Sequence, residues 1–163
     1  MDAASRTNLD DDLGFLLARL GTTTRLRLAE TVAPLDLTLR QFVVMRSIDA
    51  NEGLSQAQLG ERLRIDASSI VQVLDDCQKA GLAERRPSPA DRRRYAVHLT
   101  KEGKQHLAIA QKAVKAVQDE LFAALDDSQR AQLLELLLTL AASGPLSSLA
   151  ASPNTPSLTG LPQ

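Results

Sequence analysis

The residues of this chain best able to bind a charged partner are arginines, five of which lie in RRPSPADRRRYAVHLT, residues 85–100. From Arg62 to Lys104 there are ten Lys/Arg against six Asp/Glu, although the whole chain has a formal net charge of -1. Guanidinium groups bind phosphates through paired hydrogen bonds and are attracted into the narrow minor groove of duplex DNA. The stretch therefore indicates nucleic-acid binding, with a solvated surface hairpin as the alternative.

Two short strand candidates flank this basic loop, LAERR at 82–86 and YAVHL at 95–99. In the second, Tyr95, Val97 and Leu99 alternate with Ala and His, which is typical of a half-buried strand. The intervening PSPAD cannot continue either strand, because proline lacks the amide donor of a β-ladder. We therefore predict a β-hairpin that projects beside a helical unit, here called the wing.

The wing arginines are predicted to have different roles. Three of them stand at or just past its tip: Arg92, Arg93 and Arg94. One of these is expected to enter a minor groove. Arg85 and Arg86, on the first strand, are expected to neutralise flanking phosphates and so make binding salt-dependent. Asp91 is predicted to pair with a neighbouring arginine and hold the loop in shape.

Three helices are predicted to pack beside the wing, and each has a start signal. Thr38 with Gln41, and Ser55 with Gln58, have the spacing of capping boxes. Asp66 is a favourable N-cap for the helix that follows. The order of helix, helix, tight turn, helix and wing is that of a winged helix-turn-helix.

The helix DASSIVQVLDDCQKA is predicted to enter a DNA major groove, and Gly81 is expected to end it. Its inward stripe is Ile70, Leu74 and Cys77, with Val73 beside them. Its outward side is polar and consists of Ser68, Ser69, Gln72, Asp76 and Lys79. Short hydroxyl and amide side chains can hydrogen-bond both base edges and phosphates.

Three further helices are predicted outside this unit. The first is rich in leucine and ends near Pro34, another runs from Thr100 to about Leu125, and Asp126 and Asp127 begin the last. In the last helix, leucines occur nearly all the way round: Leu133, Leu134, Leu136, Leu137, Leu138 and Leu140. A helix that is apolar on every side must be buried on every side, so a second subunit is the expected cover.

The expected fold is mainly α with a small β-hairpin wing, a winged helix-turn-helix combined with a helical dimerisation domain. Residues 10–34 and 100–142 are assigned to the dimerisation region and residues 35–99 to the DNA-binding lobe. Residues 143–163 are rich in Pro, Ser and Thr and are expected to form a disordered tail.

Several other classes of protein are not expected. No apolar run approaches the roughly 20 residues that span a bilayer, and the N-terminus lacks the order of a signal peptide, so the chain is expected in the cytosol. No catalytic spacing or phosphate-binding loop supports an enzyme, and no cofactor is expected. Cys77 lies on an inward stripe, which favours a buried core thiol over a redox sensor. His98 and His106 with one cysteine do not supply the clustered ligands of a metal site.

The chain resembles the MarR family of ligand-responsive transcription regulators. The resemblance lies in LTLRQFVVMRSI, GLSQAQLGERLRIDASSIVQVLDDCQKAGLAERR, PADRRRYAVHLTKEGKQ and the leucine-rich last helix, and covers about residues 10–142. It implies a homodimer that binds double-stranded DNA at a pseudo-palindromic operator. The DNA-contacting residues that it implies, together with those argued above, are Ser55, Gln56, Ala67, Ser68, Ser69, Gln72, Arg86, Arg92, Arg93 and Arg94.

The resemblance also implies a small organic effector, often an aromatic acid or phenol, bound between the dimerisation helices and the DNA-binding lobe. Arg19 is the preferred residue to grip a carboxylate, and the apolar lining is expected from Leu16, Leu20, Phe42 and Met45. The favoured interpretation of Arg19, Arg25 and Arg27, on or beside the first helix, is that they are solvated or pair with acids across the dimer, and the ligand role of Arg19 is the hypothesis set against it.

Two points remain open at the level of sequence. Asp75 and Asp76 follow Gln72, where many relatives have a basic residue, so the base preference is undefined and the wing is a candidate source of most of the affinity. A winged helix used for protein interaction, with the leucine-rich helix as its docking surface, is the alternative function.

Overall fold

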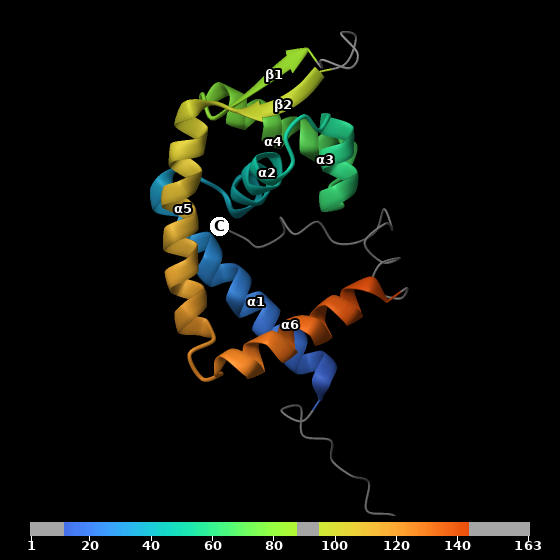
Figure 1. Ribbon diagram of the computed structural model, residues 1–163, viewed down its shortest axis with the longest axis vertical. Helices are drawn as coiled ribbons and strands as arrows, with labels where there is room; N and C mark the ends of the chain where they lie inside the picture. The colour runs from blue at the N-terminus through green and yellow to red at the C-terminus, as the bar shows by residue number, and fades with distance from the viewer. Residues whose placement is uncertain (1–11, 88–94, 144–163) are drawn as a thin grey trace, which may run out of the picture.

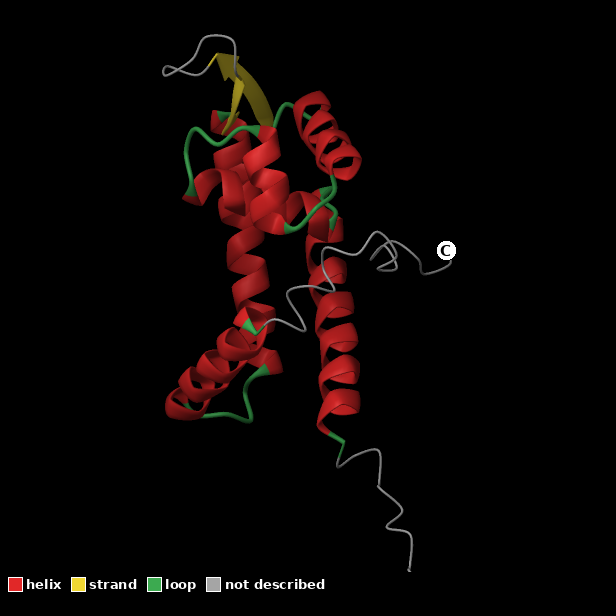
Figure 2. Cartoon of the chain, turned by 90° about the vertical axis from the view of Figure 1, so that its right-hand side faces the viewer, coloured by secondary structure: helices red, strands yellow, loops and turns green. Residues whose placement is uncertain are grey.

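The computed structural model describes residues 12–87 and 95–143, which form a helical lobe with a β-hairpin and, below it, a set of longer helices (Figures 1 and 2). The elements are α1 (Leu13–Val32), the 3-10 turn η2 (Ala33–Leu35), α2 (Leu39–Ala50), α3 (Gln56–Leu63), α4 (Ala67–Lys79), β1 (Ala83–Pro87), β2 (Tyr95–Leu99), α5 (Lys101–Leu121) and α6 (Asp127–Ala142). This mainly helical architecture with one antiparallel hairpin confirms the predicted fold class.

Helices α2, α3 and α4 begin at the capping residues predicted from the sequence. Thr38 and Ser55 each form a complete capping box with the glutamine three residues on, and Asp66 accepts the Ser69 backbone N–H at 2.9 Å. Each cap satisfies an amide that would otherwise have no partner in the first turn. Gly81 follows the end of α4 with φ +72°, the left-handed conformation that glycine adopts without strain.

The lobe is built around α2, whose side chains are buried on most of its circumference. Phe42, Met45 and Ile48 are at most 2% exposed, and the predicted inward stripe of α4 joins them in one core. Burial of this kind is the dominant favourable contribution to folding. The core thereby fixes the orientation of α4 relative to the wing.

The wing differs from its prediction at three residues. Pro87 is the last residue of β1, opposite Tyr95, because a strand end tolerates a residue that cannot donate to the ladder. Tyr95 is 58% exposed and Ala96 is only 1% exposed, so both depart from the predicted alternation, whereas Val97 and Leu99 are buried as predicted. The Val97 N–H donates to the Leu54 carbonyl at 2.9 Å, which ties the segment before α3 to the wing.

Close backbone packing joins the lobe to α5. The Thr100 hydroxyl donates to the Gly81 carbonyl at 2.7 Å, and the Thr100 amide donates to the Leu82 carbonyl at 3.1 Å. A side chain at Gly103 would overlap that same Leu82 carbonyl, so only glycine allows this approach. Movement of the wing is therefore coupled to movement of α5.

Below the lobe, α1 and α5 run side by side, and α6 turns back after α5 (Figure 2). α5 ends at Leu121, earlier than the predicted Leu125, because a short turn carries the chain to the cap at Asp126. No residue of α6 is buried in the protomer, and Leu134, Leu136 and Leu138 are each 57–60% exposed. The division into a dimerisation region and a DNA-binding lobe stays a prediction, and the predicted tail lies outside the described residues.

Candidate nucleic-acid interface

The exposed side of α4 begins at a cap that also orients its polar side chains. Asp66 accepts the Ser68 hydroxyl at 2.6 Å in addition to the Ser69 amide. Hydrogen bonds from these two serines hold the pKa of the Asp66 carboxyl well below its usual range. Because the Ser68 proton is given to Asp66, the remaining lone pairs of Ser68 suit an amino donor on a base edge better than a phosphate.

The other residues of the helix-turn-helix that are predicted to contact DNA lie on α4 and at the start of α3. Ala67 and Gln72 are exposed on α4, and Ser69 is half-buried. Ser55 is the N-cap of α3 and its hydroxyl exchanges hydrogen bonds with Gln58. Gln56, in the first turn of α3, accepts a hydrogen bond from Arg85 at 3.4 Å. The structure thus supplies an exposed polar face on α4, with Gln56 linked to it through Arg85.

Arg85 is the centre of the side-chain network behind this face. Its guanidinium donates to Asp75 and to Gln78 of α4, each at 2.7 Å, as well as to Gln56 of α3. The side chain is only 26% exposed. The guanidinium is thus engaged by three groups of the protein and would have to leave them to neutralise a phosphate, and the predicted phosphate contact of Arg85 stays a prediction.

Each of the two aspartates that follow Gln72 on α4 is paired with a basic side chain. Asp75 is neutralised by Arg85, and Asp76 lies 3.6 Å from the ammonium group of Lys79. A paired carboxylate repels a phosphate backbone much less than an isolated one does. The acidic pair is therefore compatible with a DNA-facing helix.

The arginines of the wing tip cannot be placed. Asp91, Arg92, Arg93 and Arg94 lie outside the described residues, so their predicted roles remain predictions. Arg86 is described: it pairs with Glu84 on the same strand, and its side chain is 59% exposed. Such an exposed pair is weak and can exchange for a phosphate.

The residues predicted to line a ligand pocket are not brought together in the protomer. Phe42 and Met45 are buried inside the lobe core. On α1, Leu16 is half-buried, whereas Arg19 is exposed and Leu20 is 60% exposed. About two or more turns of α1 separate these residues from Leu28 and Val32, where the helix packs against the core. In the protomer, these five side chains therefore do not line one common pocket.

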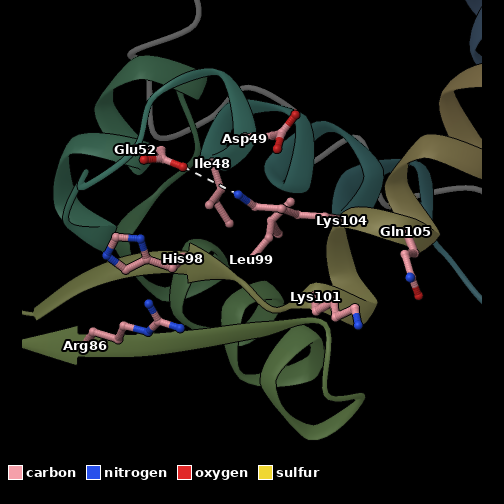
Figure 3. A pocket seen from close by; sticks show the side chains of 9 residues that line it. All are labelled: Ile48, Asp49, Glu52, Arg86, His98, Leu99, Lys101, Lys104 and Gln105. Carbon is pink, nitrogen blue, oxygen red and sulfur yellow. Dashed lines mark hydrogen bonds and ion pairs between the residues drawn. The ribbon is translucent and has the colours of Figure 1, made fainter.

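A different cavity, of about 530 Å³, lies between α2, the wing and the start of α5 (Figure 3). The sequence alone does not reveal this cavity, since its lining residues come from four separate elements. One signal was available: Lys101 and Lys104 are three residues apart at the start of a helix, just after His98.

Cys77 and His106, which were considered as a redox sensor and a metal ligand, both have roles in packing the fold. Cys77 is fully buried, and burial raises the pKa of its thiol to about 11, which confirms the predicted core cysteine. The His106 Nε2 lies 2.7 Å from the Leu35 carbonyl oxygen, so this ring links α5 to the turn after α1.

Within residues 12–87 and 95–143, no group of three or more His, Cys, Asp or Glu is arranged to hold a metal ion. In the same segments, no helix is long and apolar enough to cross a membrane.

Comparison with known proteins gives a consistent result. Residues 35–94 match the model of the MarR family. A candidate transcriptional regulatory protein for the hcr operon of Thauera aromatica is 36% identical over 130 residues, which cover 79% of this chain and 78% of that protein.

Solved structures agree with this match. The transcriptional repressor CouR bound to a 23-mer DNA duplex is 34% identical, with a TM-score of 0.76 over 86% of this chain and 99% of that one. CouR from Rhodococcus jostii RHA1 bound to p-coumaroyl-CoA is 28% identical, with a TM-score of 0.78 over 85% and 97% of the two chains.

Proposed function

This chain belongs to the MarR family of transcriptional regulators, and on that premise we propose that it is a homodimeric repressor released from its operator by a small organic ligand. Its family consists of DNA-binding proteins rather than enzymes. The observation that carries the proposal is the exposed polar face of α4, held beside the wing by the Arg85 network.

Each protomer is proposed to read one half-site. Ser68, Ser69 and Gln72 would meet base edges in the major groove, where serine and glutamine side chains can discriminate bases. A wing arginine would enter the adjacent minor groove, and Arg86 would exchange Glu84 for a phosphate. Ser55, Gln56 and Ala67 would approach the DNA backbone from the starts of α3 and α4.

Dimerisation is supported by the apolar surface of α6. Thirteen large apolar side chains of the described residues are exposed, and five of these are leucines of α6. Completing the burial of a half-exposed leucine contributes about 1 kcal/mol. Ten such leucines in a symmetric dimer would give an interface of substantial stability, and two copies would present two copies of α4 to successive major grooves.

The ligand response is supported by two neighbouring structures named CouR, one solved with a DNA duplex and the other with p-coumaroyl-CoA. For the present chain we propose an aromatic acid, a phenol or a derivative of these. A ligand that prefers the wrong separation of the two α4 helices by about 3 kcal/mol would lower operator affinity more than a hundredfold.

Selection of duplex fragments by the purified protein, with and without aromatic acids, tests the DNA-binding part. We expect a pseudo-palindromic sequence, a steep salt dependence and a loss of selectivity in Gln72→Ala. The control Gln118→Ala changes an exposed glutamine of α5 and should leave selectivity intact. Weak binding without sequence preference or salt dependence would instead support the protein-interaction module.

Light scattering tests the dimer. Leu134→Glu should give monomers, because it places a charge on the exposed leucine surface of α6. Tyr95→Glu is the control, since Tyr95 has the same 58% exposure but lies on β2, outside the predicted dimerisation region. A dimer that persists in Leu134→Glu at micromolar concentration would contradict the proposed interface.

A further inference from the structure

Ser68 and Gln72 lie about one turn apart on the outward face of α4. Ile70 and Leu74, which are 2% and 1% exposed, mark the side of the helix that is buried in the lobe core. Ser68 and Gln72 each stand two residues from Ile70, about 200° around the helix, and both are exposed. When the N-terminal end of α4 enters a major groove, as proposed above, Ser68 is the first of the two to meet a base edge.

The hydroxyl proton of Ser68 is engaged by Asp66. The Ser68 Oγ donates to the Asp66 Oδ1 at 2.6 Å, and the same carboxylate oxygen accepts the Ser69 backbone N–H at 2.9 Å. Hydrogen bonds from Ser68 and Ser69 hold the pKa of the Asp66 carboxyl well below its usual range, so this group is a carboxylate that can only accept. Because a serine hydroxyl has a single proton, Ser68 can offer DNA only its lone pairs.

The proton is expected to stay with Asp66 when DNA binds. A hydrogen bond to a carboxylate is roughly twice as strong as one to a neutral acceptor. The acceptors that bases present in the major groove, which are O6 and N7 of guanine, N7 of adenine and O4 of thymine, are all neutral. A phosphate is charged, but the exposed Asp66 carboxylate beside Ser68 repels it. Exchange of the Asp66 contact for any of these groups is therefore unfavourable.

Only two of the four bases present a hydrogen-bond donor to such an acceptor in the major groove. Adenine presents its N6 amino group there and cytosine its N4 amino group, whereas guanine and thymine present acceptors. The nearby carboxylate adds to this preference, because carboxylates also accept hydrogen bonds from base amino groups. Guanine or thymine at the same position would place its lone pairs against those of Ser68, which selects against both bases.

We propose that Ser68, oriented by Asp66, selects a base with an amino group, cytosine or adenine, at one position of each half-site. Ser68 is the residue that contacts the base, and Asp66 is a positioning residue that acts through it. This inference rests on the proposed function, because it requires α4 to lie in a major groove. It adds the chemical class of base that the first turn of α4 selects.

Selection from a random pool of duplexes, with the unaltered protein and with Ser68→Ala, tests the role of Ser68. The position whose base preference changes is assigned to this residue. There the unaltered protein should favour cytosine or adenine over guanine and thymine by about five- to tenfold, as expected for one hydrogen bond. Ser68→Ala should lose this preference and keep the same slope of log K against log salt, since no phosphate contact is removed. A loss of stability would lower the affinity for all duplexes alike and leave the preference unchanged.

Asp66→Asn tests the positioning role. Asparagine is as good an N-cap as aspartate, so α4 should keep its start. The amide is a weaker partner for the Ser68 proton than the carboxylate, and the hydroxyl can then turn to donate to guanine or thymine. These two bases should come within about twofold of cytosine and adenine at the assigned position. A preference as strong as that of the unaltered protein would contradict the role of Asp66.

Ser128→Ala is the matched control. Ser128 is the second residue of α6 after the N-cap Asp126, as Ser68 is the second residue of α4 after Asp66, and it is also exposed. It lies on a helix that is not proposed to enter the groove. Its substitution should leave the base preference unchanged at every position, and a change equal to that in Ser68→Ala would overturn the proposal.

Duplexes that lack only the amino group show which base is selected. At the assigned position of a selected duplex, cytosine is replaced by pyrimidin-2-one, or adenine by purine. The replacement should weaken binding of the unaltered protein about five- to tenfold more than binding of Ser68→Ala, because both changes remove the same hydrogen bond. The base whose replacement has this effect is the one that Ser68 contacts.

The outcomes separate this proposal from the proposed function. A selected sequence in which no position responds to Ser68→Ala, or in which the assigned position is guanine or thymine, would overturn the role of Ser68 and leave DNA binding by α4 intact. An equal loss for both proteins on the modified duplexes would do the same. Failure to select any sequence would contradict the proposed function as well.

Discussion

Replacing Asp75 with asparagine tests whether the Arg85 network prepares the DNA-binding surface. Two effects of this change have opposite signs. Removal of a negative charge from α4 should strengthen binding to the phosphate backbone. Loss of the carboxylate that holds Arg85 at 2.7 Å should loosen the wing relative to α4 and weaken binding. We expect the second effect to be larger.

The magnitude follows from the geometry of the pair. A charge-assisted hydrogen bond contributes about 1.5–3 kcal/mol when it is shielded from water. The Arg85 and Asp75 side chains are 26% and 43% exposed, so screening by solvent lowers the expected coupling to about 1–2 kcal/mol. Asp75→Asn should lower the free energy of unfolding by that amount. Because the loss of operator affinity cannot exceed the coupling, it should be at most about five- to thirtyfold.

Fluorescence anisotropy with a labelled operator at several salt concentrations measures both affinity and salt slope. In Arg85→Gln, affinity should fall while the slope of log K against log salt stays the same, because Arg85 holds the protein together rather than contacting phosphate. The double variant with Asp75→Asn should lose little more than either single variant, since both remove one interaction.

Asp76→Asn is the matched control, because it removes a charge from the same helix without touching Arg85. Its operator affinity should be unchanged or higher. Two results would refute the reasoning: Asp75→Asn binding as tightly as Asp76→Asn, or Arg85→Gln reducing the salt slope by about 0.9, the value for one lost phosphate contact.

Three further predictions concern the scaffold. Gly103→Ala should lower the free energy of unfolding by about 2–3 kcal/mol in chemical denaturation, because the new methyl group overlaps the Leu82 carbonyl; Gly21→Ala, with open space in α1, should instead be neutral or stabilising. The Asp66 pKa is lower in the folded than in the unfolded chain, so its contribution to stability is present above about pH 4 and is lost as the pH falls further. Asp66→Asn retains a capping oxygen but cannot titrate, so its melting temperature should fall less between pH 7 and pH 3, and an equal fall would contradict this role. Cys77, with its pKa raised to about 11, should react with iodoacetamide at pH 8 more than a hundredfold slower in the folded than in the unfolded protein, and equal rates would show that the thiol is accessible.

The local features of the fold could be predicted from the sequence because they depend on residues close in the chain. The caps at Thr38, Ser55 and Asp66 involve partners two or three residues away, and the inward stripe of α4 follows the helical period. The role of Arg85 could not be predicted in the same way. Its partners include Asp75 and Gln56, ten and 29 residues away, and an arginine in a basic run has the same sequence pattern whether it faces DNA or the protein.

The ligand site was the least predictable feature for a related reason. Phe42 and Met45 recur at helical spacing, and that pattern is the same for a core stripe and for a pocket lining. The structure places both in the core. The cavity shown in Figure 3 depends on how the end of α2, the wing and α5 meet, which is set by tertiary contacts such as that between Gly103 and Leu82.

The central claim is that two copies of α4 and the wing bind adjacent grooves of one duplex. Hydroxyl-radical footprinting on a selected operator, with light scattering of the same complex, tests it most directly. We expect two chains per duplex and two protected segments separated by about one helical turn, roughly 34 Å. One chain on the duplex, or a single protected segment, would contradict it.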